Sequence, residues 1–178
     1  INQEYIDLAS DRFIKDGVRI FHSDFFLEDW GNILNNGGEK KVLVIGNPPW
    51  VTNSALGILG SKNLPAKTNF QGLRGFDART GKSNFDIAEW MLIRLIEALP
   101  PSGAIAMLCK TMTARKVLRH FWRNNNGRDK SYLFQIDAKS AFGVAVDACL
   151  FVMAGQQTHN RTARLFSSLD LNADSTLF

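Results

Sequence analysis

Short runs of consecutive apolar residues alternate along the chain with longer segments in which apolar residues recur every three or four positions. The short runs are typical of buried strands, and the longer segments are typical of amphipathic helices. We predict helices over residues 1–14, 84–99 and 113–123. We predict strands over residues 18–21, 42–45, 104–108, 132–136, 148–153 and 163–166.

The order of these elements predicts the fold class. Strands that alternate with helices are typical of a doubly wound α/β sheet. The strands at 132–136 and 148–153 have a short connection, which predicts an antiparallel hairpin at the end of the sheet. Residues 51–83 form a long segment rich in Gly, Asn, Lys and Ser, which is typical of a functional or disordered loop. Residues 156–178 are expected to form a polar tail.

Composition is that of an ordinary globular domain. The 178 residues, 45% apolar and 21% charged, suffice for one domain with a sizeable core. No apolar run approaches membrane-spanning length, so no membrane partner is expected. Cys109 and Cys149 lie inside apolar runs, which predicts buried, reduced thiols and favours the cytoplasm. No metal site is expected, because His22, His120 and His159 are far apart in the sequence.

The net charge of +4 permits a polyanionic partner without requiring one. Positive residues gather in the segment 51–83, where Asp77 is the only acidic residue. The segment is the better candidate for contacts with a nucleic-acid backbone, because it directly follows the turn described next. Its basic residues are Lys62, Lys67, Arg74, Arg79 and Lys82.

The sequence Asn47-Pro48-Pro49-Trp50 directly follows the apolar run 42–45. Ligands of parallel sheets bind beyond the carboxyl ends of the strands. The two prolines end the strand and hold an extended turn that has no amide hydrogens of its own. The turn thus presents an amide side chain, carbonyl oxygens and an indole ring, which can accept hydrogen bonds from an amine and stack on a flat ring. The alternative is a simple strand-ending turn with a surface tryptophan.

This motif resembles the catalytic motif of S-adenosylmethionine-dependent amino-methyltransferases, above all the bacterial restriction–modification enzymes that make N6-methyladenine in DNA. The resemblance implies that Asn47 and the carbonyl of Pro48 accept hydrogen bonds from the target amine, with Pro49 holding the turn. It implies that Trp50 stacks on an adenine flipped out of double-stranded DNA. It also implies a Rossmann-like class I methyltransferase domain over residues 1–155, with 51–83 as a basic insert.

Three further residues resemble functional positions of this family. Asp24 resembles the acidic residue that binds the adenine of the cofactor, S-adenosylmethionine, and Phe25 resembles its apolar neighbour. Asn47 is expected to contact the cofactor as well as the substrate. Phe142 resembles a second aromatic residue that packs on the flipped base. The alternatives are a turn-capping aspartate at Asp24 and an ordinary core phenylalanine at Phe142.

One departure from the family concerns the N-terminal side. The glycine-rich loop that wraps the methionine part of the cofactor is absent, and the chain starts without Met. We expect an incomplete sheet whose missing strands come from an N-terminal half, or a partner or specificity subunit.

Other readings remain open. Relatives with the same motif methylate an RNA base or a protein glutamine, and a non-catalytic fragment that binds nucleic acid or a partner is a further alternative. Trp50 and the basic segment favour a nucleobase over glutamine.

Overall fold

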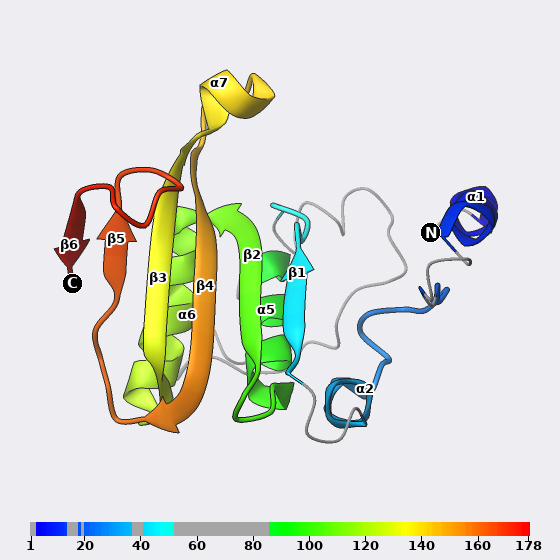
Figure 1. Cartoon of the computed structure of the whole chain (residues 1–178), viewed down its shortest axis with the longest axis horizontal. Helices are drawn as coiled ribbons and strands as arrows, with labels where there is room; N and C mark the ends of the chain where they lie inside the picture. The colour runs from blue at the N-terminus through cyan, green and yellow to red at the C-terminus, as the bar shows by residue number, and fades with distance from the viewer. Residues whose placement is uncertain (1–2, 14–17, 19, 37–40, 52–85) are drawn as a thin grey trace, which may run out of the picture.

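The computed structural model describes residues 3–13, 18, 20–36, 41–51 and 86–178. A six-stranded mixed sheet with the strand order β1-β2-β4-β3-β5-β6 organises this part of the chain (Figure 1). Its strands are β1 (Leu43–Gly46), β2 (Ala104–Lys110), β3 (Gly127–Asp137), β4 (Asp147–Thr158), β5 (Arg164–Phe166) and β6 (Ser175–Leu177). The helices are α1 (Gln3–Phe13), α2 (Trp30–Asn35), α5 (Ile87–Ala98), α6 (Thr111–Arg123) and α7 (Ala138–Phe142).

The directions of the strands confirm a mixed α/β fold. β1 pairs with β2 in parallel, and α5 lies between them in the chain. β4 is antiparallel to both of its neighbours, β2 and β3, so the predicted antiparallel hairpin is confirmed. Its predicted place at the end of the sheet is wrong, because β5 and β6 extend the sheet beyond β3. β5 is parallel to β3, and β6 is antiparallel to β5.

The core lies between the sheet and the helices α5 and α6, which stand behind the strands in Figure 1. Side chains alternate along β2, so that Ile105, Met107 and Cys109 are buried against these helices. Cys149 and Phe151 of β4 lie beside them, directly across from Cys109 and Met107. Both cysteines are fully buried and free, as their apolar neighbours predicted.

The opposite face of the sheet is also apolar. Leu43 and Ile45 of β1 are 65% and 71% exposed, and they lie across from Ala104 and Ala106 of β2. Farther along the sheet, the ring of Phe134 stacks on Phe166 with centroids 4.7 Å apart. Among the elements that the structure describes, no helix lies over this face (Figure 1).

Most predicted elements are confirmed. The three predicted helices correspond to α1, α5 and α6, and five of the six predicted strands correspond to β1 to β5. The predicted strand at 18–21 is wrong, because residues 18, 20 and 21 have no strand structure and Phe21 is 72% exposed. A short apolar run forms a strand only where a neighbouring strand satisfies its backbone groups, and no described strand pairs with these residues.

Three elements were not predicted, and two of them are short helices set by their caps. The Oδ1 atom of Asp29 accepts a hydrogen bond from the backbone N–H of Asn32 at the start of α2, at 3.0 Å. At the start of α7, the Oδ1 atom of Asp137 likewise accepts a hydrogen bond from the backbone N–H of Ser140. The third element is β6, which pairs with β5, so residues 156–178 contribute two strands to the sheet.

A buried arginine ties α5 to the hairpin of β3 and β4. Arg128 is 2% exposed. Its guanidinium donates hydrogen bonds to four carbonyl oxygens, at nitrogen–oxygen distances between 2.6 and 3.3 Å. Three of these carbonyls end α5 or follow it, where the regular hydrogen bonds of the helix have ended. Burial lowers the pKa of Arg128, but a guanidinium stays protonated at neutral pH. The four carbonyls belong to Ile96, Leu99, Pro100 and Gly155.

Replacing this arginine should therefore destabilise the fold. We expect Arg128→Met to lower the free energy of unfolding by about 2–4 kcal/mol, since it removes four hydrogen bonds of a buried charged group. Thermal denaturation of the full-length protein should show a decrease in Tm of about 5–10 °C. The matched control is Arg161→Met, because Arg161 is exposed and donates to the side chain of Asn125. Equal Tm values for the two variants would contradict a stabilising role of Arg128.

Candidate active site

The candidate site begins where β1 ends. Because β1 and β2 are parallel, their carboxyl ends meet at one edge of the sheet, and Gly46 lies across from Met107. The next four residues, Asn47 to Trp50, therefore lie beside the last residues of β2. Pro48 is buried and Trp50 is half-buried, whereas Asn47 and Pro49 are exposed. The motif is thus presented at the strand ends, where the sequence pattern placed it.

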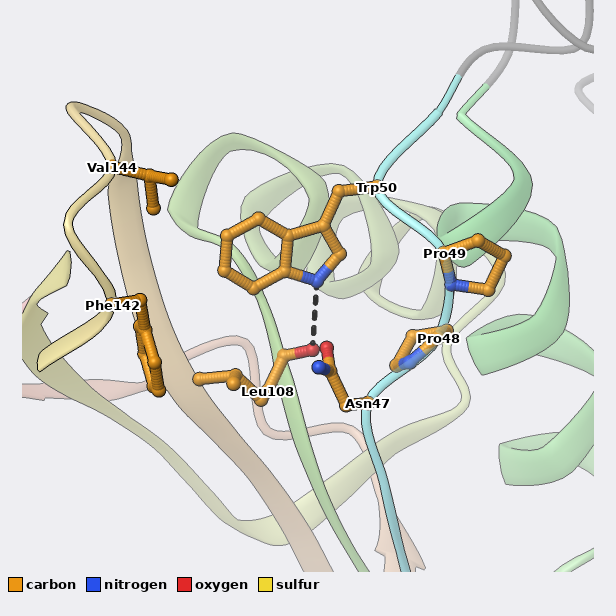
Figure 2. A pocket seen from close by; sticks show the side chains of 7 residues that line it. All are labelled: Asn47, Pro48, Pro49, Trp50, Leu108, Phe142 and Val144. Carbon is orange, nitrogen blue, oxygen red and sulfur yellow. Dashed lines mark hydrogen bonds between the residues drawn. The ribbon is translucent and has the colours of Figure 1, made fainter.

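Two contacts from β2 hold Trp50. The indole Nε1 atom donates a hydrogen bond to the carbonyl oxygen of Leu108 at 3.3 Å (Figure 2). The carbonyl oxygen of Trp50 accepts a hydrogen bond from the Nζ atom of Lys110 at 2.9 Å. Both the ring and the backbone of Trp50 are therefore fixed relative to the end of the same strand.

A cavity of about 360 Å³ opens beside this turn. Figure 2 shows the rings of Trp50 and Phe142 on opposite sides of the hollow, with Leu108 between them. The described lining is mainly apolar, and apart from the indole N–H of Trp50 its polar group is the side-chain amide of Asn47. Such a pocket suits a flat, largely apolar group that carries a hydrogen-bonding atom on one edge. The lining residues are Asn47, Pro48, Pro49, Trp50, Leu108, Phe142 and Val144.

Phe142 comes to the site from a distant part of the chain. It is the last residue of α7, which lies in the connection between β3 and β4. The helix ends at Gly143, whose φ of 70° is left-handed and favours glycine. The connection ends at Asp147, the first residue of β4. Its Oδ1 atom accepts a hydrogen bond at 2.8 Å from the hydroxyl of Thr111 at the start of α6, directly after β2. Phe142 is 53% exposed, so its ring faces the opening of the cavity rather than the core.

Asp24 and Phe25 lie away from this cavity. The Oδ1 atom of Asp24 accepts a hydrogen bond from the backbone N–H of Phe26 at 2.9 Å, which caps a local turn. The ring of Phe25 packs in an aromatic cluster, 4.5 Å from Trp30 and 6.2 Å from Trp90 between ring centroids. A second, more polar hollow of about 480 Å³ is lined by residues 26–31 and part of α5, and neither Asp24 nor Phe25 lines it.

The other sequence-based candidates cannot be placed. Lys62, Lys67, Arg74, Arg79 and Lys82 lie outside the described residues, in the segment 52–85. In the part of the chain that the structure describes, no group of His, Cys, Asp or Glu is arranged to hold a metal ion. Nor does any described helix have the length and apolar character needed to cross a bilayer.

Sequence reasoning missed several residues of the site. Leu108 and Val144 line the cavity, and Lys110 and Asp86 stand behind the turn. Leu108 and Lys110 carried one available signal, since they lie at the end of the buried strand β2, which is parallel to β1 and so ends at the same edge. Asp86 gave only the signal of a helix N-cap, which says nothing about a site.

The paired thiols behind the site are structural. Cys109 and Cys149 lie directly opposite each other on β2 and β4. A hydrogen bond with Cys149 and burial raise the pKa of Cys109, so its thiol is protonated at neutral pH. A buried, protonated thiol is a poor nucleophile, and Cys109 is therefore a core residue.

Comparisons with known proteins point to a methyltransferase. No protein-family model matches the chain. Over 156 residues, or 85% of the chain, it is 46% identical to the type II methyltransferase M.NspV of Nostoc sp. (strain ATCC 29411 / PCC 7524), and it spans 32% of that protein.

Among solved structures, the type IIL restriction-modification enzyme MmeI in complex with DNA matches 97% of this chain and 24% of its own, with 15% identity and a TM-score of 0.48. That likeness of shape is too weak to carry a conclusion. The 46% identity in sequence does carry a conclusion. The matched residues belong to the family of the type II methyltransferase M.NspV, of which the chain spans about a third.

Proposed function

We propose that this chain is part of an enzyme that transfers a methyl group from S-adenosylmethionine to the N6 amine of an adenine flipped out of double-stranded DNA. The observation that carries the proposal is the cavity with Trp50 and Phe142 on opposite sides, in which Asn47 is the one polar side chain among the described lining residues apart from the indole of Trp50. The relationship to a type II methyltransferase supports the reaction class. DNA as substrate and adenine as the base are parts of the proposal.

Asn47 and Pro48 activate the amine in this mechanism. An exocyclic amine on an aromatic base shares its lone pair with the ring and is a poor nucleophile. Acceptors on its two hydrogens, the Asn47 side-chain oxygen and the Pro48 carbonyl, localise the lone pair on nitrogen and align it for attack. The rigid Pro48-Pro49 backbone keeps both acceptors in place without competing amide hydrogens. When bound, S-adenosylmethionine would supply the methyl group: the new nitrogen–carbon bond would form as the sulfur–carbon bond of the sulfonium breaks, a neutral thioether would leave, and the methylated nitrogen would release one proton to solvent at the open side of the cavity.

Trp50 and Phe142 hold the base. The two rings lie on opposite sides of the hollow, so a flat ring bound between them would contact both. Stacking of a base on one aromatic side chain contributes about 1–3 kcal/mol. Two stacking surfaces offset the loss of stacking when a base leaves the helix. Leu108 and Val144 add apolar contacts to the lining around the base.

Asp24 and Phe25 are proposed to bind the adenine of S-adenosylmethionine, with Asn47 between cofactor and base. A carboxylate that accepts one backbone N–H keeps acceptor positions for an amine, so the partly buried Asp24 suits this role. The aromatic cluster around Phe25 fixes a flat apolar surface beside it. The basic residues Lys62, Lys67, Arg74, Arg79 and Lys82 are proposed to contact DNA phosphates.

The chain needs a partner segment, from the same polypeptide or a separate specificity subunit. Leu43 and Ile45 expose apolar side chains on the face that no described helix covers, and β1 is an edge strand of the described sheet. Exposed apolar faces and strand edges are normally covered in folded proteins. The chain spans about a third of its relative, whose remaining length has room for such a segment. We place the complete protein in the bacterial cytoplasm, with its DNA substrate.

Alternative substrates are less well supported. A glutamine side chain has no flat ring, and the two facing aromatic rings would contribute little to binding it. A base in RNA would fit the same cavity and is a second candidate. A methylation assay of the full-length protein with tritiated S-adenosylmethionine on DNA, RNA and protein substrates separates these outcomes, and incorporation into RNA or protein alone would overturn the proposal.

Asn47 should be essential for catalysis. We expect Asn47→Ala to reduce kcat about 100- to 1000-fold, since it removes one acceptor from the amine. Cofactor affinity measured by calorimetry should change little, because the backbone of the turn is kept. The matched control is Asn172→Ala, at an exposed asparagine between β5 and β6. Methyl transfer by Asn47→Ala near the wild-type rate would refute the role of Asn47.

Phe142 should act on the base rather than on the cofactor. We expect Phe142→Ala to weaken binding of DNA with a flipped base about 5- to 100-fold, which corresponds to the loss of one stacking contact. DNA with 2-aminopurine at the target position should show a smaller fluorescence increase with this variant. Phe178→Ala serves as control, because Phe178 packs on Trp122 of α6 instead. An unchanged 2-aminopurine signal would exclude Phe142 from the base pocket.

The isolated chain should bind S-adenosylmethionine poorly. Its described residues include Asp24 and Asn47 but lack the covering segment proposed above. Calorimetry with the 178-residue chain should therefore give a much weaker affinity than the full-length protein. Equal affinities would contradict the need for that segment.

A further inference from the structure

A lysine and an aspartate behind the candidate site connect three separate segments of the chain. Lys110 is the last residue of β2, and its Nζ atom donates a hydrogen bond to the carbonyl oxygen of Trp50 at 2.9 Å. The same Nζ atom lies 3.8 Å from the Oδ2 atom of Asp86, the N-cap of α5. One ammonium group therefore links the motif turn to both β2 and α5.

Asp86 is itself firmly held. Its side chain is 10% exposed, and its Oδ1 atom accepts a hydrogen bond from the backbone N–H of Ala88 at 3.0 Å. Its Oδ2 atom accepts one from the hydroxyl of Thr113 in α6, also at 3.0 Å. The carboxylate is thus a fixed negative charge between two core helices. Lys110, one-third exposed, is held between this charge and the carbonyl of Trp50.

The turn depends on such outside contacts. Pro48 and Pro49 have no N–H groups, so the turn cannot be closed by hydrogen bonds from its middle residues. The described contacts that fix its end all come from elsewhere in the chain. The indole of Trp50 donates to Leu108, the carbonyl of Trp50 accepts from Lys110, and the carbonyl of Val51 accepts from the N–H of Ile87 at 3.1 Å.

We propose that Lys110 and Asp86 are positioning residues for Trp50. Asp86 fixes the ammonium of Lys110, and Lys110 fixes the backbone at Trp50, so the pair sets where the indole ring meets the base and where Asn47 meets the amine. Lysine suits this place, because its three donors serve a carbonyl and a carboxylate at once. Neither residue touches the substrate. This inference rests on the proposed methyl transfer, in which the position of Trp50 decides the rate.

The first test observes Trp50 directly and needs no activity. The full-length protein is labelled with 5-fluorotryptophan, and the Trp50 signal in the ¹⁹F NMR spectrum is assigned with Trp50→Phe. We expect Lys110→Met to shift and broaden the Trp50 signal while leaving those of Trp30 and Trp122 unchanged. Asp86→Asn keeps a good N-cap but removes the charge, and it should perturb the Trp50 signal to a lesser degree.

The second test is kinetic. We expect Lys110→Met to reduce kcat about 10- to 100-fold, because a misplaced reacting group costs rate. The KM for S-adenosylmethionine should stay within about threefold, and Lys110→Arg should recover most of the rate, since it restores a donor and a charge. The matched control is Lys116→Met, which breaks the 3.6 Å ion pair between Lys116 and Glu89 of α5 at a distance from the turn. It should leave kcat and the Trp50 signal unchanged.

The outcomes separate this inference from the proposed function. If the wild-type protein methylates no substrate, the proposed function fails, and the Trp50 signal still decides whether Lys110 positions the turn. If the protein is active but Lys110→Met leaves the Trp50 signal and kcat unchanged, the inference is overturned and the proposed function stands. Equal losses in Lys110→Met and Lys116→Met would also overturn it, because they would reflect general destabilisation.

Discussion

The parallel pairing of β1 with β2 is the constraint on which the candidate site depends. It brings the ends of two strands that are distant in sequence to the same edge, with Gly46 across from Met107. Every later contact of the motif uses this register: the indole of Trp50 reaches Leu108, and its carbonyl reaches Lys110. A shift of one residue would turn the side chains of β1 to the other face and remove these contacts.

The antiparallel direction of β4 explains why Phe142 lies at the same edge of the sheet as the motif. β4 runs opposite to β2 and β3, so β3 has the same direction as β1 and β2. The connection from the end of β3 to the start of β4 must then lie at the edge that carries the motif. α7 is in this connection, which explains how Phe142 comes to face Trp50 across the cavity (Figure 2). A parallel strand in the place of β4 would have required a crossover and would have left this edge without α7.

The sequence predicted those features that depend on local pattern. The strands β1 to β5 and the helices α1, α5 and α6 have apolar patterns, and the motif turn follows its strand directly. β6 has no such pattern. The run 18–21 has a strand pattern but no described partner, and a pattern does not show whether a partner is present. The short helices α2 and α7 depend on single capping bonds from Asp29 and Asp137. The resemblance indicated Trp50 and Phe142, whereas Lys110 was missed because its role requires three segments to meet in space.

The proposed base side and cofactor side of the site are held by different contacts. α5 and α6 bury one face of the sheet and hold β2, and through Lys110 and Asp86 they also hold the turn. Trp50 is therefore fixed by elements of the core, whereas Phe142 stands on the short helix α7, which extends beyond the sheet in Figure 1. Asp24 and Phe25 lie between α1 and α2 in the chain, and Phe25 packs on Trp30 and on Trp90 of α5. Under the proposed function, α5 thus supports both sides: its N-cap fixes Trp50 through Lys110, and its Trp90 supports the ring beside Asp24.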